Sequence, residues 1–307
     1  FWGFSMTLVM CVPNFSEGRD QKKIKAIRDE IEKVPGTKLL FCEADPDHNR
    51  LDITFVAPVE AAKEAAFNAT KKAAELIDMD KHKGEHPRMG ATDVIPFVPI
   101  LGTTMKECVE IAREVGKRIG EELGIPVYLY EEAATRPERK NLADIRRGEY
   151  EAIKREIGKV PSRKPDFGPE KVGKAGATAV GARMPLIAFN VNLGTNDLSI
   201  AKAIAKAVRH SSGGLRYVKA MGFEIKERGI VQVSMNLVNY KKTPIFRAFE
   251  MIKREAERYG VPVIGSEIVG MVPMDALTAC ADYYLRLENF KEDQILEKRL
   301  WGEEACK

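Results

Sequence analysis

The sequence predicts an α+β protein made of two ferredoxin-like βαββαβ halves, in which helices cover the sheets. From residue 6 onward, apolar runs and helical periodicities follow the order strand, helix, strand, strand, helix, strand. The same order begins again at residue 185. Between the two repeats lies a polar stretch, residues 135–180, which is rich in proline and glycine. We therefore expect one subdomain over residues 6–180 and a second over residues 181–307.

In the first half, the spacing of apolar residues separates helices from strands. Ile24, Ile27 and Ile31 recur at helical spacing, whereas Ile53 and Phe55 alternate with polar neighbours, as in a strand with one buried face. The predicted strands are residues 6–15, 38–45, 51–58, 94–100 and 125–133, and the predicted helices are 21–34, 59–77 and 105–124.

The second half repeats this pattern without visible sequence identity to the first. A turn at Arg228 and Gly229 joins its two middle strands. The predicted strands are residues 185–193, 216–229, 230–240 and 261–270, and the predicted helices are 198–210, 245–260 and 274–287.

Composition excludes several classes of protein. Hydrophobic residues make up 44% of the 307 positions, which favours a folded protein over a disordered one. Lys and Arg number 49 against 45 Asp and Glu, so the small net charge of +4 does not indicate a nucleic-acid partner. No apolar run reaches the roughly 18 residues of a membrane span. Five scattered cysteines without CxxC spacing indicate neither a disulfide framework nor a zinc site, and they fit the reducing cytoplasm.

The stretch GEHPRMGATD, residues 84–93, concentrates an acid, a base and a cation between turn-forming residues. His86 is one of four histidines, and it stands between Glu85 and Pro87 with Arg88 two positions further on. A proline biases the residue before it toward extended geometry, so this segment holds the imidazole away from any helix. The sequence therefore indicates that the segment presents His86 to a ligand.

Several phrases together carry a resemblance to a known family. They are CVPNFSEGRD, NRLDITFV, GEHPRMGATDVIPFVPI, PDFGP, GATAVGAR and AFNVNL. The chain resembles glutamate formiminotransferase, the folate-dependent enzyme that in animals forms the amino-terminal part of a bifunctional protein with a cyclodeaminase. The resemblance covers essentially the whole chain and lacks the cyclodeaminase part. It implies that residues 6–180 and 181–307 are the N- and C-terminal formiminotransferase subdomains.

The resemblance implies transfer of a formimino group from N-formimino-L-glutamate to N5 of tetrahydrofolate, without a metal. His86 falls on the catalytic acid/base of the family, and Glu43 falls on an acidic residue near the reaction, with Asp45 and Asp47 as neighbouring alternatives. The segment that corresponds to a folate-contacting loop comprises Gly168, Pro169, Glu170, Lys171, Val172, Gly173, Lys174, Ala175 and Gly176. Because its middle differs from the family's sequence, a modified reduced pterin is an alternative co-substrate. The resemblance also implies a homodimer in the cytoplasm, with small-molecule substrates and neither nucleic acid nor membrane as a partner.

The chemistry of the residues agrees with this activity. When a formimino group moves between two amines, one nitrogen loses a proton and the other gains one, and a histidine with its ordinary pKa of about 6.5 can do both. Arginine binds carboxylates with two parallel hydrogen bonds, so Arg50 and Arg88 are candidates for the substrate glutamate or the folate tail. We expect His82 to be a solvated neighbour, and His48 either to form a turn or to line the site.

Three other functions remain open at this point. A formyl transfer, or transfer to a modified pterin, would keep His86 and alter the segment 168–176. A non-catalytic folate-binding protein would not need the His86 motif. Metal-dependent hydrolysis would use histidines and aspartates, but His82 and His86 lie four residues apart in a Gly/Pro segment and not on one helix face. The candidate ligands for such a metal are His48, His82, His86, Asp45, Asp47 and Asp93.

Overall fold

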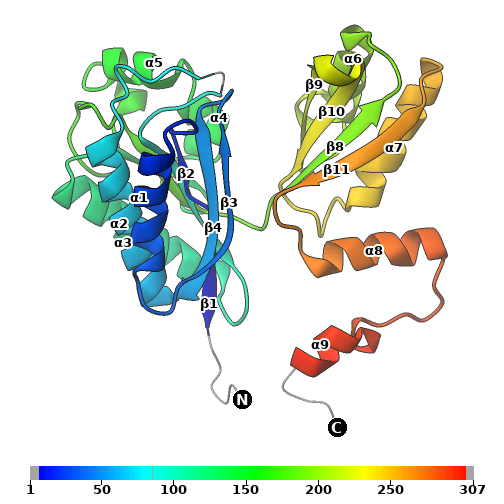
Figure 1. The fold of residues 1–307 in the computed structure, drawn as a ribbon, viewed down its shortest axis with the longest axis horizontal. Coiled ribbons are helices and arrows are strands. Elements are labelled where there is room, and N and C mark those ends of the chain that lie inside the picture. The colour runs from blue at the N-terminus through cyan, green and yellow to red at the C-terminus, as the bar shows by residue number, and fades with distance from the viewer. Residues whose placement is uncertain (1–6, 85, 302–307) are drawn as a thin grey trace. The chain divides into compact units, whose positions relative to one another are not determined.

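The computed structural model describes residues 7–84 and 86–301, with the side chains of the last two left aside. Met6 and Glu85, which enter the sequence analysis, therefore lie outside the described residues. The chain divides into two compact units, Phe1–Met184 and Pro185–Lys307, and each is described by itself (Figure 1). The boundary expected after residue 180 falls inside strand β7 (Thr178–Ala182), which belongs to the sheet of the first unit.

The sheet of the first unit contains the expected ferredoxin-like arrangement. Its strands are β1 (Leu8–Cys11), β2 (Asn14–Phe15), β3 (Lys38–Asp45), β4 (Arg50–Pro58), β5 (Thr92–Pro99), β6 (Val127–Glu131) and β7. β1 and β2 are two short pieces of the first expected strand, and each pairs with β4 and β5. The order β3, β4, β1/β2, β5 is antiparallel throughout, as the βαββαβ pattern predicts.

Two parallel strands extend this sheet beyond the predicted unit. β7 pairs in parallel with both β5 and β6, so it lies between them. The sequence predicted β6 as an extension, but the GATAVGAR phrase that forms β7 was interpreted as turns or close packing. The close packing does occur: a Cβ on Gly181 would lie 2.5 Å from the Tyr130 ring of the neighbouring strand.

Three helices cover one face of this sheet, namely α1 (Gln21–Glu32), α2 (Val59–Leu76) and α3 (Met105–Glu122), which lie side by side in Figure 1. Ile24, Ile27 and Ile31 are buried against the sheet, as their spacing predicts. The side chain of Asp20 caps α1, and a capping box formed by Thr104 and Glu107 starts α3. These signals fix where each helix begins.

The opposite face of the sheet is partly covered as well, which the sequence analysis did not predict. Short helices from the 135–180 stretch pack there: η1 (Pro137–Arg139), α4 (Leu142–Ile145), α5 (Glu149–Glu156) and η2 (Pro161–Arg163). Ile145 and Ile153 form a second small core with Tyr128, Tyr130 and Val94 of the sheet. Alternation along β6 sends its tyrosines to this face while Val127 and Leu129 face α3.

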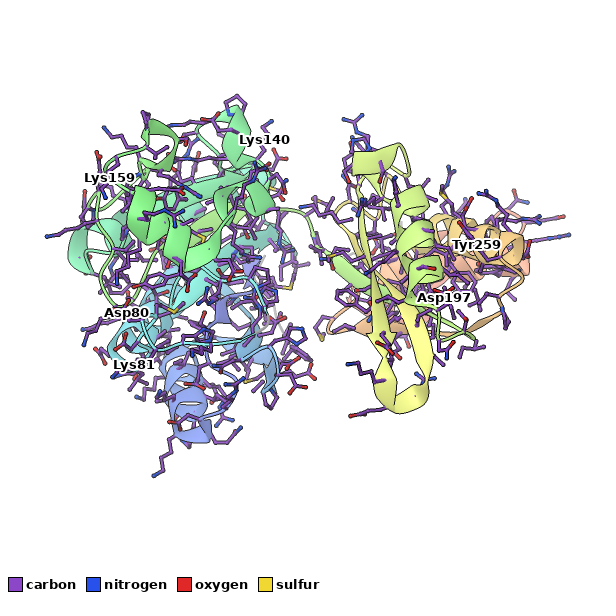
Figure 2. The ribbon with its side chains drawn as sticks, turned by 90° about the horizontal axis from the view of Figure 1, so that it is seen from above. Asp80, Lys81, Lys140, Lys159, Asp197 and Tyr259 are labelled. Carbon is purple, nitrogen blue, oxygen red and sulfur yellow. The ribbon has the colours of Figure 1, made fainter. Side chains whose placement is uncertain are left out.

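The second unit has the predicted βαββαβ order. It consists of β8 (Ile187–Leu193), α6 (Leu198–Val208), β9 (Val218–Ile225), β10 (Ile230–Leu237), α7 (Ile245–Arg258) and β11 (Val263–Val269), followed by α8 (Met274–Leu285) and α9 (Leu296–Trp301). Its antiparallel sheet has the order β11, β8, β10, β9, and α6 and α7 pack on one face. Short helices η3 (His210–Ser212), η4 (Lys226–Arg228) and η5 (Glu292–Gln294) fill the connections. Asp197, labelled in Figure 2, caps α6 by accepting from the backbone N–H of Ser199.

No helix among the described residues is both long and apolar enough to cross a membrane.

Candidate active site

A bulge in β5 brings together residues that are far apart in the sequence. Asn14 pairs with Val94 and Phe15 pairs with Thr92, so Asp93 is an extra residue on its strand. Such bulges redirect a side chain, and they are frequent next to active sites. Arg50, the first residue of β4, and Arg146, the residue that caps the end of α4, both reach the carboxylate of Asp93.

Asp93 is fully buried and has three donors. Its Oδ2 accepts from Arg50 Nη1 at 2.8 Å and from Arg146 Nη2 at 2.7 Å, and its Oδ1 accepts from the backbone N–H of Met89 at 3.0 Å. Burial alone would raise the pKa of Asp93, but the positive charges of Arg146 and Arg50 outweigh it and lower that pKa. Asp93 is therefore ionised, and it links β5, the His86 segment and both arginines.

His86 lies beside these charges with a neutral ring. Burial lowers the pKa of His86 to about 4, and the nearby cations Arg50 and Arg146 lower it further than the opposing charge of Asp93 raises it. The sequence analysis assumed an ordinary pKa near neutrality, and the structure corrects this because the sequence shows neither the burial nor Arg146. At neutral pH the imidazole can accept a proton.

The hydrogen bond of His86 indicates which nitrogen is free. Its Nδ1 lies 2.6 Å from the carbonyl oxygen of Pro87, and a carbonyl oxygen can only accept, so Nδ1 carries the proton. Nε2 then keeps its lone pair and is the basic atom. The ring of His48 meets that of His86 edge to face, with 6.2 Å between centroids. His48 therefore both forms a turn and lines the site.

The acidic residues near His86 are arranged by the hairpin of β3 and β4. Asp45 closes the turn, because its carboxylate accepts from the backbone N–H groups of Asp47 and His48 and contacts His48 Nδ1 at 2.6 Å. Glu43 is exposed on β3, and its partner across the strands is Asp52. No contact printed by the described geometry joins Glu43 to His86.

Asp52 is a site candidate that the sequence analysis treated only as a possible partner of an arginine. It lies on the sheet face opposite Ile53, and the side-chain amide of Asn14 donates to its Oδ1 at 2.6 Å. Burial raises the pKa of Asp52, with a smaller contribution in the same direction from Glu43. The alternation of residues 51–58 already contained this signal, since it sends Asp52 to the side away from the helices.

Arg88 has a structural environment rather than an open one. The sequence analysis named it as a carboxylate-binding candidate, but its guanidinium is buried and donates to Glu149 at 2.8 Å and to Glu151 at 2.7 and 2.8 Å. Its Nε also donates to Nδ1 of His82 at 3.3 Å. These bonds fix the 84–93 segment to α5.

His82 is likewise part of this network and not the solvated neighbour we expected. Its Nε2 lies 3.1 Å from the backbone oxygen of Asn49, while Nδ1 accepts from Arg88. Burial lowers the pKa of His82. A neutral ring with the proton on Nε2 satisfies both contacts.

The segment 168–176 lies directly against the segment that carries His86. Gly90 bridges to Gly176, the N–H of Ala91 donates to Ala175 O at 2.8 Å, and the N–H of Ala177 donates to Met89 O at 2.9 Å. Lys171 and Lys174 are exposed along the same segment. The two phrases singled out in the sequence are therefore neighbours in space.

Other parts of the unit were also searched for sites. No group of three or more metal-ligating side chains occurs among residues 7–84 and 86–301. Two surface pockets, of about 380 and 360 Å³, are lined by Asp80 and Tyr150 and by Arg139 and Arg163, respectively, and neither includes His86. In the larger one, Asp80 (Figure 2) already accepts from Tyr150 and Lys154.

A neutral imidazole next to two arginines, beside the sheet of a ferredoxin-like unit, defines a site for proton transfer on an anionic substrate. The chain belongs to the formiminotransferase family. Residues 8–183 match the formiminotransferase domain, N-terminal subdomain, and residues 188–299 match the formiminotransferase domain.

Relatives from several kingdoms agree with the family match. The chain is 57% identical to the glutamate formimidoyltransferase of Thermoplasma acidophilum over 96% of this chain and 98% of that protein. It is 52% identical to the glutamate formimidoyltransferase of Streptococcus pyogenes, again over 96% of this chain. It is 48% identical to the formimidoyltransferase-cyclodeaminase of Dictyostelium discoideum, of which it spans 56%.

Proposed function

We propose that this chain is a glutamate formimidoyltransferase, which moves a formimino group from N-formimino-L-glutamate to N5 of tetrahydrofolate. The observation that carries the proposal is the neutral His86 imidazole beside Arg50, within a chain that is similar to enzymes of this name over nearly its whole length. Tetrahydrofolate, or a related reduced pterin, is the co-substrate.

His86 is the acid/base in the proposed reaction. The N5 lone pair of the pterin attacks the amidine carbon of the donor, and Nε2 of His86 takes the proton that N5 loses. The resulting tetrahedral carbon then breaks its bond to the glutamate nitrogen, which receives the same proton from the imidazolium. Atoms and charge balance, because one proton leaves N5 and one arrives on the departing amine.

The low pKa of His86 suits the first of these steps and strengthens the second. A base must be unprotonated before it acts, and a ring with a pKa of about 4 is neutral at physiological pH. Once protonated, an imidazolium next to Arg50 and Arg146 is a strong acid, so it returns its proton readily to the leaving nitrogen. Glu43, Asp45 and Asp52 are the carboxylates proposed to stabilise the cationic amidine.

The folate side of the site is proposed to include the segment 168–176. It abuts residues 89–91, it offers the exposed cations Lys171 and Lys174, and folates carry glutamate carboxylates. Arg88 is not part of the proposed contacts, since its donors are taken by glutamates of α5. A homodimer and a cytoplasmic location complete the proposal.

A transferase assay tests the proposal directly. Purified protein is mixed with formiminoglutamate and tetrahydrofolate, with and without a chelator, and 5-formiminotetrahydrofolate is measured. We expect activity that the chelator does not change. Parallel reactions with N-formylglutamate and with a modified reduced pterin test the alternative donor and carrier. Absence of transfer to tetrahydrofolate, combined with folate binding, would instead indicate a non-catalytic binding protein.

A further inference from the structure

The two arginines beside His86 share one carboxylate, which leaves a positive charge unbalanced. Both Arg50 and Arg146 donate to the same oxygen of Asp93. The other Nη of Arg50 donates to Asn14 Oδ1, which is neutral, at 2.5 Å. The side chains of both arginines are 14% exposed.

Arg146 in particular lacks partners for its charge. Its Nε is buried and has no hydrogen-bond partner in the part of the chain that the structure describes. Burial lowers the pKa of Arg146, and although Asp93 opposes this effect, repulsion from Arg50 adds to it. A buried guanidinium without a full set of acceptors is costly, and an anion that accepts from it removes the cost.

We infer that Arg50 and Arg146, aligned by Asp93, bind the α-carboxylate of the amino-acid donor. This inference rests on the proposed function and adds the recognition of the substrate. Asp93 is a positioning residue, because it touches the arginines and not the donor. Arg146 and Arg50 are binding residues.

The chemistry of the two substrates favours the donor over the folate at this position. In the donor, the α-carboxylate and the reacting nitrogen are attached to the same carbon, so an anchored carboxylate holds that nitrogen close by. His86 lies within the field of both arginines, as its lowered pKa indicates. The glutamate carboxylates of a folate are separated from N5 by an aminobenzoyl ring, so binding them here would move N5 away from His86.

The side chain of the donor also explains the need for two cations. A carboxylate that replaces water must receive several hydrogen bonds, and two guanidinium groups supply them in fixed directions. The bulge at Asp93 sets those directions, because it turns that carboxylate toward both arginines at once.

The test compares Arg146→Gln with Arg147→Gln as a matched control. Arg147 is the adjacent residue, its side chain is 78% exposed, and it pairs with Asp144 on the surface. We expect Arg146→Gln to raise the KM for formiminoglutamate by about 10- to 100-fold, as for loss of a charged hydrogen bond. Equilibrium binding of tetrahydrofolate should not change, and the control should match the wild type in both measurements.

A donor analogue isolates the α-carboxylate itself. N-formimidoyl-4-aminobutyrate is the donor without that group, so the wild type should use it much less efficiently than formiminoglutamate. In Arg146→Gln this discrimination should collapse, because the residue that reads the carboxylate is gone. If the discrimination persists, or if folate affinity falls while the KM for the donor stays constant, the inference is wrong.

Two further variants separate positioning from simple structural damage. The groups that face the His86 ring are Arg50, Arg146, Asp93 and His48. Loss of the positive charge in Arg146→Gln should move the acidic limb of the pH profile upward, whereas Arg146→Lys should leave it in place and still lose discrimination. Asp93→Asn should move it downward, because the charge of Asp93 raises the pKa of His86. Unmoved limbs in both charge-removing variants would overturn the inference.

Failure of the proposed function is distinguishable from failure of this inference. Calorimetric titration with L-glutamate in the absence of folate needs no turnover. Loss of that binding in Arg146→Gln supports the carboxylate site even if the wild type transfers no formimino group. Absence of glutamate binding in the wild type, or equal binding in both proteins, refutes the site.

Discussion

The charges around His86 determine which protonation state is available for chemistry. A histidine of ordinary pKa would be partly protonated at physiological pH, and protonated rings cannot take a proton from N5. Burial and two neighbouring arginines keep this ring neutral down to a pKa of about 4. The arginines therefore have two consequences: they attract an anionic substrate, and they set the basicity of the residue beside it.

The first prediction concerns the pH profile of kcat/KM. Because His86 must be neutral to act as a base, activity should be present above its pKa and should fall as the pH drops through about 4. This group should give no limb near neutrality in the free enzyme. Once the donor carboxylates are bound, their negative charge should raise the pKa, so the limb in kcat should lie at higher pH than the limb in kcat/KM.

His86→Ala tests the same assignment by removal. Loss of a general acid/base is typically worth about 10²- to 10⁴-fold, so we expect turnover to fall by that amount and the acidic limb to disappear. Tetrahydrofolate affinity should change far less. A variant with normal turnover would transfer the proton role to His48, the histidine in ring contact with His86.

The second prediction concerns His82, whose role is stability. His82→Ala removes the acceptor for Arg88 Nε and the donor to Asn49 O, leaving two half-buried polar groups without partners. We expect a loss of about 1–3 kcal/mol in the free energy of unfolding, measured by denaturant titration. Lys81→Ala is the control, since the Lys81 side chain is 84% exposed (Figure 2) and should change stability little. Equal stability of the two variants would refute this role.

Glycines allow the His86 segment and the segment 168–176 to pack backbone against backbone. A Cβ on Gly90 would lie 2.1 Å from the oxygen of Ala177 and 2.8 Å from that of Ala175. Both oxygens belong to backbone that cannot move aside without breaking the bonds between the segments. The close approach therefore depends on the absence of a side chain at position 90.

The third prediction follows from this packing. Gly90→Ala should lower the melting temperature strongly, because the added methyl group overlaps backbone atoms. Gly173→Ala is the control for stability, since a Cβ there meets nothing within 4 Å and φ is not in the left-handed region. Thermal unfolding followed by circular dichroism gives the comparison. If the two variants melt together, the segments are not in contact as described.

The sequence predicts much of the fold because its signals are local. Ile24, Ile27 and Ile31 define a helix face within a single window, and the alternation around Ile53 and Phe55 defines a strand face. The two βαββαβ orders follow from such windows, and both are confirmed. His86 was found because the motif around it is contiguous.

The rest of the site could not be predicted, because it depends on contacts between distant residues. Arg146 lies 53 residues after Asp93, in a polar stretch with several other arginines, and nothing in its local sequence distinguishes it from Arg147. The bulge that turns Asp93 toward the arginines depends on the register of β2 against β5. Arg88 was overvalued for the same reason, since its glutamate partners are more than 60 residues away.

The two units differ in how completely they cover their apolar residues. Each has its own core, and the described cores share no residue. In the first unit, the large apolar side chains that remain exposed are Leu40, Leu101 and Val160. In the second unit they are far more numerous and concentrate in β11, α8 and the segments that follow them, including Ile268, Val269, Met274, Leu277, Tyr283, Leu285 and Leu287. Contiguous apolar surface of this kind is typical of an interface.

The last prediction is that the protein is a homodimer and that α8 contributes to the contact. α8 has Ala276 as its one buried residue among those described, and burying its exposed leucines and tyrosines against a second copy would remove them from water. Light scattering at micromolar concentration should give twice the chain mass of 34.3 kDa. Leu285→Lys should weaken the dimer, because it places a charge in the apolar contact, whereas Leu101→Lys, at a site that is equally 68% exposed in the first unit, should not. A mass of one chain for the wild type would show that a single copy is the stable form, and a dimer that survives Leu285→Lys would exclude this end of α8 from the interface.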